Sequence, residues 1–588
     1  MIVRSRIKPS AYFDSVTLML VQREVRALPG VSEAGAVMGT QANKELLRDA
    51  GLLTPEADAA KPDDLILSVQ AGSVEAADAA LTRSEELLVR RRESVAADAY
   101  RPRTLASALR MLQGANLALI SVPGRFAAGV AKEALAAGLH VMIFSDNVPL
   151  EAEIELKQLA ASRGVLLMGP DCGTAILGGA ALGFGNHVRR GTIGVVGAAG
   201  TGIQEVTSLI HRAGAGISHA IGTGGRDLSK SVGGVTATQG LAALAADRHT
   251  EVIVLISKPP ASEVAQRLLS AARRTGKPIV VSFVGATIRE SDRLFAAQTL
   301  EDAARKAVQL ATGSSPRWEE RHALPAQEAG RLASSQKYIR GLYSGGTLCY
   351  EALVLLERYV GPVHSNTPLD SASALESAMR SRAHTVIDMG GDEFTVGRLH
   401  PMLDPELRHQ RLLREAEDPE VAVILLDVVL GHGAHPDPAR ELAPVIQQAR
   451  QRARAQGRWL PVVLSVCGTE EDPQDYQAQV SALLDAGAIV QPSNAQAVRL
   501  AGLIAEAAGN KGQPRDQVQI EVPAESQPLP DAAGILPLLA APPRVVNIGL
   551  DLFAESLQAQ GVDVIALDWQ PPAGGKQKLI DLLDKLNA

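Results

Sequence analysis

Short runs of apolar residues alternate with longer amphipathic stretches along most of the chain. The apolar runs at 116–122, 421–430 and 462–466 are rich in valine, leucine and isoleucine, as strands buried on both faces are. The stretches between them repeat their apolar positions with helical spacing. A regular alternation of strand and helix is typical of βαβ units. We therefore predict an α/β fold with several parallel-sheet domains of the Rossmann or flavodoxin type.

Polar segments at 93–103, 312–333 and 513–538 interrupt this alternation, and we interpret them as linkers. A chain of 588 residues is long enough for several domains. In the first block we expect helices at 15–28, 41–50 and 74–92, with strands at 31–38 and 64–69. The five predicted units span residues 1–100, 101–190, 191–312, 335–512 and 540–588.

The strand at 193–196 runs into a glycine-rich turn and then a helix, and the next strand ends in a second glycine turn. Glycine lets backbone N–H groups approach an anion closely, and a helix N-terminus adds positive potential. The two turns therefore predict a phosphate or carboxylate site at one edge of a parallel sheet. No P-loop lysine follows, and tight turn geometry alone is the alternative. The predicted binding residues are Gly200, Thr201, Gly202, Gly222, Gly224 and Gly225.

A similar pair of turns recurs in the block at 335–512. The first precedes a helix, where Ser344 is also a good N-cap residue. Asp392 follows the second turn and is a catalytic candidate, which would position a substrate amine, bind a metal or simply stabilise the turn. We predict two similar α/β domains side by side. The binding residues predicted for the second are Ser344, Gly345, Gly346, Thr347, Gly390 and Gly391.

Candidate catalytic side chains lie at the ends of strands. His432 and His435 follow the most apolar strand in a glycine-rich turn, and histidine suits acid–base chemistry near neutral pH. A polar turn that caps the sheet is the alternative. Arg226 would pair with a carboxylate or phosphate, or with its neighbour Asp227. Further candidates in loops or at strand ends are Lys258, Arg398, His400 and the possible nucleophile Cys172.

Composition excludes several classes of function. The net charge is −7 and aromatic residues make up 3% of the chain, so the features of a nucleic-acid-binding protein are missing. The three cysteines form no CxxC pair, and we predict no metal site. No segment has the apolar length of a membrane span or the pattern of a signal peptide. We expect a cytoplasmic protein that binds neither nucleic acid nor membranes.

Ordered motifs along nearly the whole chain resemble the FdrA family, whose domains are similar to those of succinyl-CoA synthetase. Residues 116–176 resemble the second half of a CoA-binding domain. GTIGVVGAAGTG at 191–202 and GTGGRD at 222–227 resemble the α-subunit ligase domain, while SGGT at 344–347 and VVLGHGAHPDP at 428–438 are similar to the β-subunit ligase domain. The resemblance implies a small α/β unit at 1–100, a CoA-binding-like domain at 101–190, ligase-like domains at 191–312 and 335–512, and an α/β tail at 540–588.

The chain departs from the synthetases at one catalytic position. Synthetases that form a nucleoside diphosphate carry phosphate on a histidine in a Gly-His-Ala-Gly turn, whereas residues 282–289 read SFVGATIR here. The resemblance to FdrA also implies a role as one component of oxamate carbamoyltransferase, which acts together with two further proteins. That reaction uses phosphate or carbamoyl phosphate and requires no phosphohistidine.

We therefore predict a component of a carbamoyl or acyl transferase of allantoin catabolism, which converts oxalurate and phosphate into oxamate and carbamoyl phosphate. The expected ligands are phosphate or carbamoyl phosphate and a small carboxylated or amide substrate. The expected partners are other proteins of a hetero-complex, a second copy of the chain, or both. Two alternatives stay open: a nucleoside-diphosphate-forming acyl-CoA synthetase that binds CoA and nucleotide, and a non-catalytic scaffold.

Overall fold

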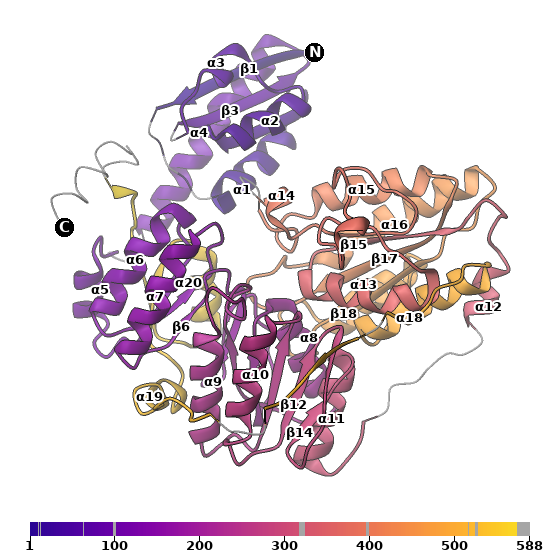
Figure 1. Ribbon diagram of the computed structural model, residues 1–588. Coiled ribbons are helices and arrows are strands. Elements are labelled where there is room, and N and C mark those ends of the chain that lie inside the picture. The colour runs from indigo at the N-terminus through magenta and orange to yellow at the C-terminus, as the bar shows by residue number, and fades with distance from the viewer. Residues whose placement is uncertain are drawn as a thin grey trace.

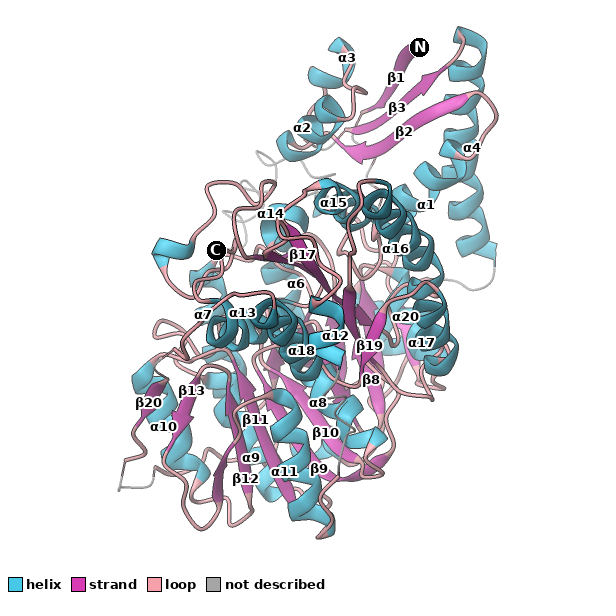
Figure 2. Ribbon diagram, turned by 90° about the vertical axis from the view of Figure 1, so that its right-hand side faces the viewer, coloured by secondary structure: helices cyan, strands magenta, loops and turns pink. Residues whose placement is uncertain are grey.

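The computed structural model describes residues 1–572 apart from positions 10, 12, 14, 63, 98–100, 317–323, 396–398, 516 and 524–526. It confirms the α/β class, because its three larger sheets are built mainly of parallel strands with helices packed against them. Figure 1 shows a small N-terminal unit above three larger units, and Figure 2 shows the same units from the side.

The N-terminal unit is a three-stranded antiparallel sheet with the order β1-β3-β2. Its first strand is not among the predicted elements, because basic residues alternate along it and hide the apolar pattern. Arg6 and Lys8 of this strand form ion pairs with Glu85 on the long helix α4. The elements are β1 (Ile2–Lys8), α1 (Ser15–Arg26), β2 (Val31–Met38), α2 (Gln41–Asp49), α3 (Pro55–Asp58), β3 (Leu65–Ala71) and α4 (Val74–Ala97).

Two segments far apart in the sequence form the second sheet, which is entirely parallel and has the order β22-β21-β4-β5-β6. The tail predicted at 540–588 is thus part of this sheet rather than a unit of its own, because β21 pairs with β4 along four residues. The elements are α5 (Leu105–Met111), β4 (Leu117–Ile120), α6 (Gly124–Ala136), β5 (His140–Ile143), α7 (Leu150–Ser162), β6 (Leu167–Met168), α19 (Leu536–Leu539), β21 (Val545–Ile548), α20 (Asp551–Ala559) and β22 (Val564–Ala566).

The third sheet is the core of the first ligase-like domain, and its order is β14-β12-β11-β9-β10-β7-β8. Strands β7 and β8 belong to the preceding sequence block but add an antiparallel hairpin to its edge. The elements are β7 (Thr174–Leu177), β8 (Ala180–Gly183), β9 (Arg190–Gly197), α8 (Gly200–Arg212), β10 (Ile217–Gly222), α9 (Val235–Ala246), β11 (Val252–Ser257), α10 (Ser262–Ala272), β12 (Ile279–Phe283), β14 (Leu294–Ala296) and α11 (Leu300–Thr312).

The second ligase-like domain has a parallel five-stranded sheet with the order β16-β15-β17-β18-β19. The linker after it returns to the first domain, where β20 (Val518–Ile520) pairs with β13 (Ala286–Ile288). The elements are α12 (Leu324–Ala329), β15 (Tyr338–Tyr343), α13 (Gly346–Val360), η1 (Ser371–Ser373), β16 (Thr385–Asp388), α14 (Asp392–Thr395), α15 (Glu406–Glu417), β17 (Val421–Val429), α16 (Pro438–Ala455), β18 (Val462–Cys467), α17 (Tyr476–Asp485), β19 (Ile489–Gln491) and α18 (Asn494–Ala507).

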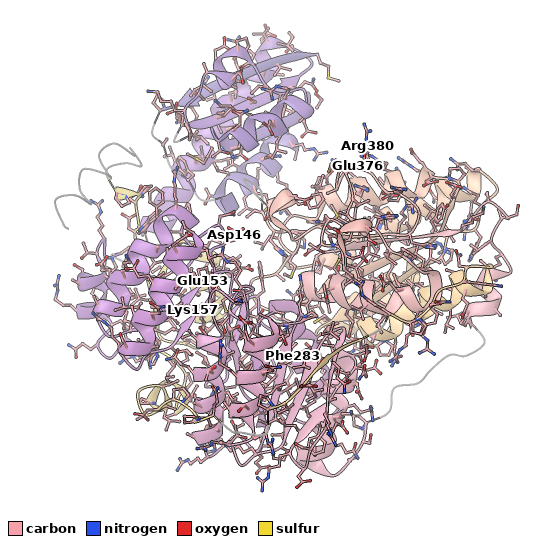
Figure 3. The ribbon with its side chains drawn as sticks, in the orientation of Figure 1. Asp146, Glu153, Lys157, Phe283, Glu376 and Arg380 are labelled. Atoms are coloured by element: carbon pink, nitrogen blue, oxygen red, sulfur yellow. The ribbon has the colours of Figure 1, made fainter. Side chains whose placement is uncertain are left out.

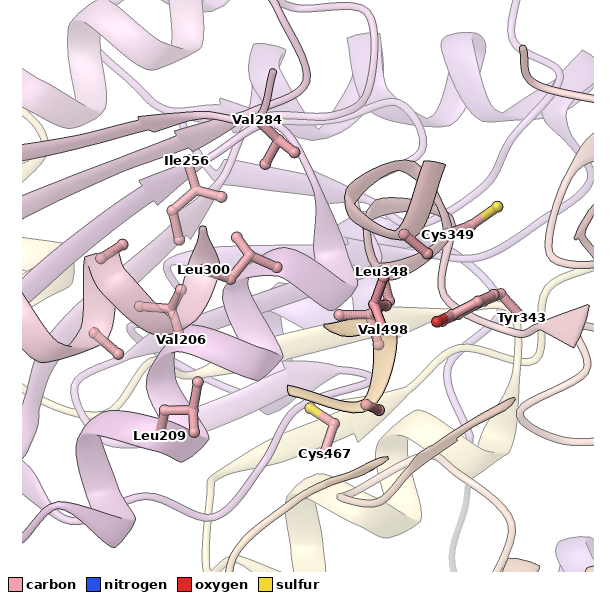
Figure 4. Packing of buried hydrophobic residues seen from close by; sticks show 14 of the residues in the cluster. Val206, Leu209, Ile256, Val284, Leu300, Tyr343, Leu348, Cys349, Cys467 and Val498 are labelled. Atoms are coloured by element: carbon pink, nitrogen blue, oxygen red, sulfur yellow. The ribbon is translucent and has the colours of Figure 1, made fainter. Parts of the chain in front are cut away.

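The two ligase-like domains share one hydrophobic core. Figure 4 shows Val206 and Leu300 of the first domain in the same cluster as Leu348 and Val498 of the second. All four side chains are completely buried. Because apolar burial is the main favourable term in folding, this shared core fixes the two domains against each other. Helices α8 and α13 meet here, and the candidate site lies where they begin.

Candidate functional site

Helices α8 and α13 start against each other, and their first turns are complementary. A methyl group on Gly202 would lie 2.9 Å from Cγ2 of Thr347, and one on Gly345 would lie 2.9 Å from Cγ2 of Thr201. The backbone N–H of Thr347 also donates to Oγ1 of Thr201 at 3.4 Å. The two predicted turns of the two domains are therefore brought together, and glycine is needed at both contacts because a larger side chain would push the helices apart.

Strand pairing makes positions in the two domains equivalent. In the first ligase-like domain, Gly222 of β10 and Ile256 of β11 both pair with the last residue of β9. In the second ligase-like domain, Asp388 of β16 pairs with the last residue of β15. Asp427 of β17 directly follows Leu426, which pairs with the residue before the last one of β15. Two apolar positions of the first domain thus correspond to two carboxylates of the second. Sequence analysis did not identify either aspartate, although a charged residue inside the very apolar strand VAVILLDVV was a visible signal.

Asp427 fills the glycine turn of the second domain. Its carboxylate accepts the backbone N–H groups of Ser344 and Gly345, each at 2.8 Å, and the Ser344 hydroxyl at 3.0 Å. Arg408 forms an ion pair with the same carboxylate at 3.1 Å. Asp427 is completely buried. An internal anion therefore occupies these N–H groups, and Ser344 and Gly345 are not available to a ligand.

Asp388 brings a second carboxylate to the start of α13. A methyl group on Gly346 would lie 2.6 Å from its Oδ2 atom, and the N–H of Gly390 donates to its Oδ1 atom at 3.0 Å. Burial raises the pKa of Asp388, while the positive charge of Lys258 lowers it. The predicted residues Gly346 and Gly390 thus lie beside a carboxylate, and Gly391 lies 3.4 Å from the Asp388 carbonyl oxygen on the same measure. Two buried carboxylates, Asp388 and Asp427, therefore lie at this edge of the second domain.

The corresponding turn of the first domain holds no carboxylate. The N–H of Ala198 donates to the backbone oxygen of Ile256 at 3.0 Å. Within the described part of the chain, no side chain accepts the N–H groups of residues 199–202, and the N-cap of α8 makes no side-chain bond. Gly200 is half-buried, and a methyl group there would lie 3.3 Å from Oγ1 of Thr174. The start of α8 is therefore the position best suited to an anion.

Lys258 brings a positive charge from the end of β11 towards the second domain. It follows β11 directly, is half-buried, and its Nζ atom lies 5.5 Å from the ring centre of Tyr350 on α13. Among the described residues it forms no ion pair. The strand pairing makes Ser257 of the first domain equivalent to Val428 of the second. Lys258, the next residue, is therefore equivalent to Val429. The positive charge of Lys258 acts on the second turn as well, because it lowers the pKa of Asp388.

The second glycine turn of the first domain packs against backbone. A methyl group on Gly222 would lie 2.3 Å from the Thr174 carbonyl oxygen, and one on Gly224 would lie 2.2 Å from the Pro170 carbonyl oxygen. Gly225 faces the Asp171 carboxylate at 2.9 Å on the same measure. These contacts explain the glycines by close packing, and the binding role predicted for this turn stays a prediction.

Arg226 is bound to the second sheet rather than to its neighbour Asp227. Its Nε atom lies 2.9 Å from Oε2 of Glu153, and its Nη2 atom donates to the Val148 carbonyl oxygen at 2.7 Å. Asp227 instead pairs at 2.7 Å with Lys157, which is as fully buried as Asp227 itself. Figure 3 labels Glu153 and Lys157 on α7, where they face this turn. Arg226 therefore joins two domains, and a catalytic role for it stays a prediction.

His400 lies over the turn of the second domain. A methyl group on Gly390 would lie 2.7 Å from its Nε2 atom, and its ring centre is 5.4 Å from that of Phe184. Burial lowers the pKa of His400 to about 4, so the imidazole is neutral near pH 7. Arg398 lies outside the described residues. Asp392 is the first residue of α14, but its side chain also lies outside the described part.

His432 and His435 lie in the turn predicted from the sequence, after β17. His432 exchanges backbone hydrogen bonds with Gly185, and burial lowers its pKa to about 4. His435 accepts the N–H of Asp437 through Nδ1 at 3.1 Å, and its Nε2 atom is 3.3 Å from Glu441. Both ring nitrogens of His435 therefore already have partners in and just after this turn. The catalytic role predicted for His432 and His435 stays a prediction.

Cys172 is not poised as a nucleophile. It is buried, and burial raises the pKa of its thiol to about 12. The described residues contain no group of three or more histidine, cysteine, aspartate or glutamate side chains that would hold a metal ion. No helix among them is both long and apolar enough to cross a membrane.

Comparison with family models matches three regions. The CoA-ligase model matches residues 342–504, and the CoA-binding domain model matches residues 188–285, most of which belong to the unit predicted at 191–312. The model described as AllF, heavy metal-associated domain, matches residues 1–102. That segment contains neither cysteine nor histidine, so it lacks the thiolate and imidazole donors of most heavy-metal sites.

The uncharacterized protein YahF of Escherichia coli K12 is 46% identical over 500 residues, which cover 84% of this chain and 97% of YahF. The α-2 subunit of the ADP-forming succinate–CoA ligase of Trichomonas vaginalis is 30% identical over 31% of this chain and 60% of its own length. Among solved structures, an acetyl-coenzyme A synthetase of Ca. Korarchaeum cryptofilum matches 67% of this chain and 82% of its own, with 18% identity and a TM-score of 0.26.

Proposed function

The chain belongs to the AllF/FdrA-like family that includes YahF, and on that premise we propose that it is one component of an enzyme that transfers a carbamoyl or other acyl group through an acyl phosphate. At the coarser level it has the domains of an acyl-CoA ligase-type enzyme. The specific reaction we propose is the phosphorolysis of oxalurate in allantoin catabolism, carried out in the cytoplasm with partner proteins. A phosphate oxygen attacks the carbamoyl carbon, the bond from that carbon to the oxamate nitrogen breaks, and that nitrogen takes a proton.

The open start of α8 is the observation that carries this proposal. The N–H groups of residues 199–202 have no side-chain acceptor among the described residues, and the helix dipole favours an anion at this end. Lys258 adds a positive charge from the adjacent strand, whereas the equivalent turn of the second domain holds Asp388 and Asp427. One of the two turns is thus suited to phosphate or carbamoyl phosphate.

The segment after β12 supports a reaction without a phosphohistidine. It contains no histidine, and residues Ala286–Ile288 form β13, which pairs with β20 from the linker. A methyl group on the preceding Gly285 would lie 3.1 Å from Val354 of α13. This segment is held between the linker and α13, so it is poorly suited to carry a phosphoryl group between two sites.

Hydrogen exchange on the full chain tests this proposal. We expect carbamoyl phosphate and inorganic phosphate to slow exchange of the amides at 199–202 but not those of Ser344 and Gly345. With the partner proteins present, oxamate release from oxalurate should require phosphate. Protection at both turns, or phosphate-independent release, would contradict the proposal.

An acyl-CoA ligase is the second candidate, and the CoA-ligase and CoA-binding matches favour it. It requires CoA and nucleotide as well as phosphate. If CoA raises the melting temperature of the full chain while carbamoyl phosphate does not, the ligase reaction replaces the transferase. If neither has an effect in the presence of partners, a scaffold role remains.

A further inference from the structure

Each of the two helices that form the site carries a buried glutamate five residues after its first glycine. These residues, Glu205 on α8 and Glu351 on α13, are 1% and 0% exposed. A fully buried carboxylate is costly unless hydrogen bonds or positive potential compensate for it. Neither glutamate has an ion-pair partner within 4.0 Å among the described residues. Their compensation comes instead from helix N-termini.

The two glutamates reach into opposite domains. Oε1 of Glu205, in the first domain, accepts the backbone N–H of Asn494 at 2.9 Å. Oε1 of Glu351, in the second domain, accepts the backbone N–H of Leu300 at 2.8 Å. Asn494 and Leu300 are the first residues of α18 and α11, the last long helices of the two domains. Each domain therefore caps the final helix of the other.

Asn494 connects the two caps. Its side-chain Nδ2 donates to Oε2 of Glu351 at 2.8 Å, while its backbone N–H serves Glu205. The N-cap hydroxyl of Ser493 donates to Glu301 in the first turn of α11. Four helices thus converge on one buried polar cluster inside the apolar core that the domains share. Changing the orientation of α8 relative to α13 would break at least one of these bonds.

We propose that Glu205 and Glu351 are positioning residues for the junction at which α8 and α13 begin. They lie one to two turns from the glycines at which the helices meet, and together they fix how the two N-termini face each other. The inference deepens the proposed function, because it assigns to these residues the geometry of the proposed anion site. The ligand itself touches neither of them.

Hydrogen exchange on the full chain, without any ligand, tests the positioning role of Glu205 and Glu351 independently of the reaction. E351M keeps much of the side-chain volume but removes both acceptors, whereas E351Q keeps an acceptor for the Leu300 N–H. We expect E351M to speed exchange at least threefold at Leu300 and also at 199–202 and 344–347, and E351Q to restore most of the protection. E357Q is the matched control, because Glu357 lies on the same helix but pairs with Arg515 at 3.2 Å.

Phosphate affinity measured by calorimetry gives the second readout. If the glutamates position the two helix N-termini, folded E351M and E205M should bind inorganic phosphate at least fivefold more weakly than E351Q and E205Q. If exchange at 199–202 and 344–347 is unchanged in E351M, the positioning role of Glu351 is contradicted, even if the variant is less stable. If the wild type binds no phosphate, the proposed function fails. The exchange experiment alone still decides whether the two glutamates position the helices.

Discussion

The glycine turns before α8 and α13 look alike in sequence but differ in the side chains that reach them. In the second domain Asp427 fills the turn and Asp388 lies beside it, whereas the first domain has Ile256 and Gly222 at the same positions of the sheet. A glycine-rich turn at a helix N-terminus is therefore only a potential anion site, and residues on neighbouring strands decide whether an internal carboxylate already occupies it.

Removing Asp427 from the turn of the second domain should cause the largest loss of stability. D427A leaves Arg408 without its buried partner and the N–H groups of Ser344 and Gly345 without an acceptor. Loss of one partner of a buried ion pair costs about 3–5 kcal/mol of unfolding free energy. Chemical denaturation measures it. E417A is the control, since Glu417 and Arg452 form an exposed pair and its loss should cost below about 1 kcal/mol.

The buried glutamates that join the domains should make stability depend on pH. Burial, together with the nearby Glu205 and Glu301, raises the pKa of Glu351 to about 7 against the lowering effect of the hydrogen bonds from Leu300 and Asn494. A carboxyl group whose pKa is higher in the folded state contributes its full stabilisation when the pH is below the unfolded-state pKa. This contribution to the unfolding free energy is lost as the pH rises towards 7. The shift corresponds to up to about 3 kcal/mol.

Denaturation between pH 4.5 and 8 in the wild type and E351Q tests this expectation. The unfolding free energy of the wild type should fall towards pH 7 more steeply than that of E351Q, which cannot titrate. Parallel profiles for the two proteins would refute it. E357Q should follow the wild type more closely than E351Q does.

A carboxylate introduced beside the turn of the first domain should compete with anions for its N–H groups. I256D places a carboxylate where Asp427 lies in the other domain, so that it can accept the free N–H groups of the turn. We expect phosphate binding to weaken at least about tenfold, equivalent to about 1.4 kcal/mol. Calorimetry measures the affinity, and I256V is the control without a new charge. Equal affinity in both variants would place the anion elsewhere.

The smallest expected effect concerns Lys258. K258M removes the positive charge next to α8 but breaks no ion pair among the described residues. It should weaken phosphate binding about threefold at low salt, with a smaller difference at high salt because salt screens a half-buried charge. K230M is the control, because Lys230 is 79% exposed and pairs with Glu263 in the same domain. An identical loss in both variants would indicate a nonspecific charge effect.

Local pattern was enough to predict the α/β class and most central strands. The strand predicted at 421–430 is β17 (Val421–Val429), and the strand predicted at 462–466 is β18 (Val462–Cys467). Long apolar runs work well because strands buried on both faces need no polar residues. Strand β1 escaped prediction because its arginines and lysine form ion pairs with α4, a contact that local sequence does not show.

The site was only partly predictable. The sequence indicated the glycines of both turns, but not that Thr201 and Thr347 lie against Gly345 and Gly202. It gave Asp227 as one alternative partner of Arg226, whereas the structure pairs Arg226 with Glu153 on α7. Such partners are separated by many residues, and no local period relates them.

The sequence by itself determined where strands end in glycine turns, because backbone conformation and helix starts depend on neighbouring residues. Only the tertiary structure decided which turn is open, because Asp427 reaches the turn at Ser344 from a strand more than eighty residues away along the chain. It likewise decided that the C-terminal strands complete the second sheet and that Glu205 and Glu351 cap helices of the opposite domain. Charge compensation inside a core is a property of residues that meet in space, so it follows from the packing of whole domains.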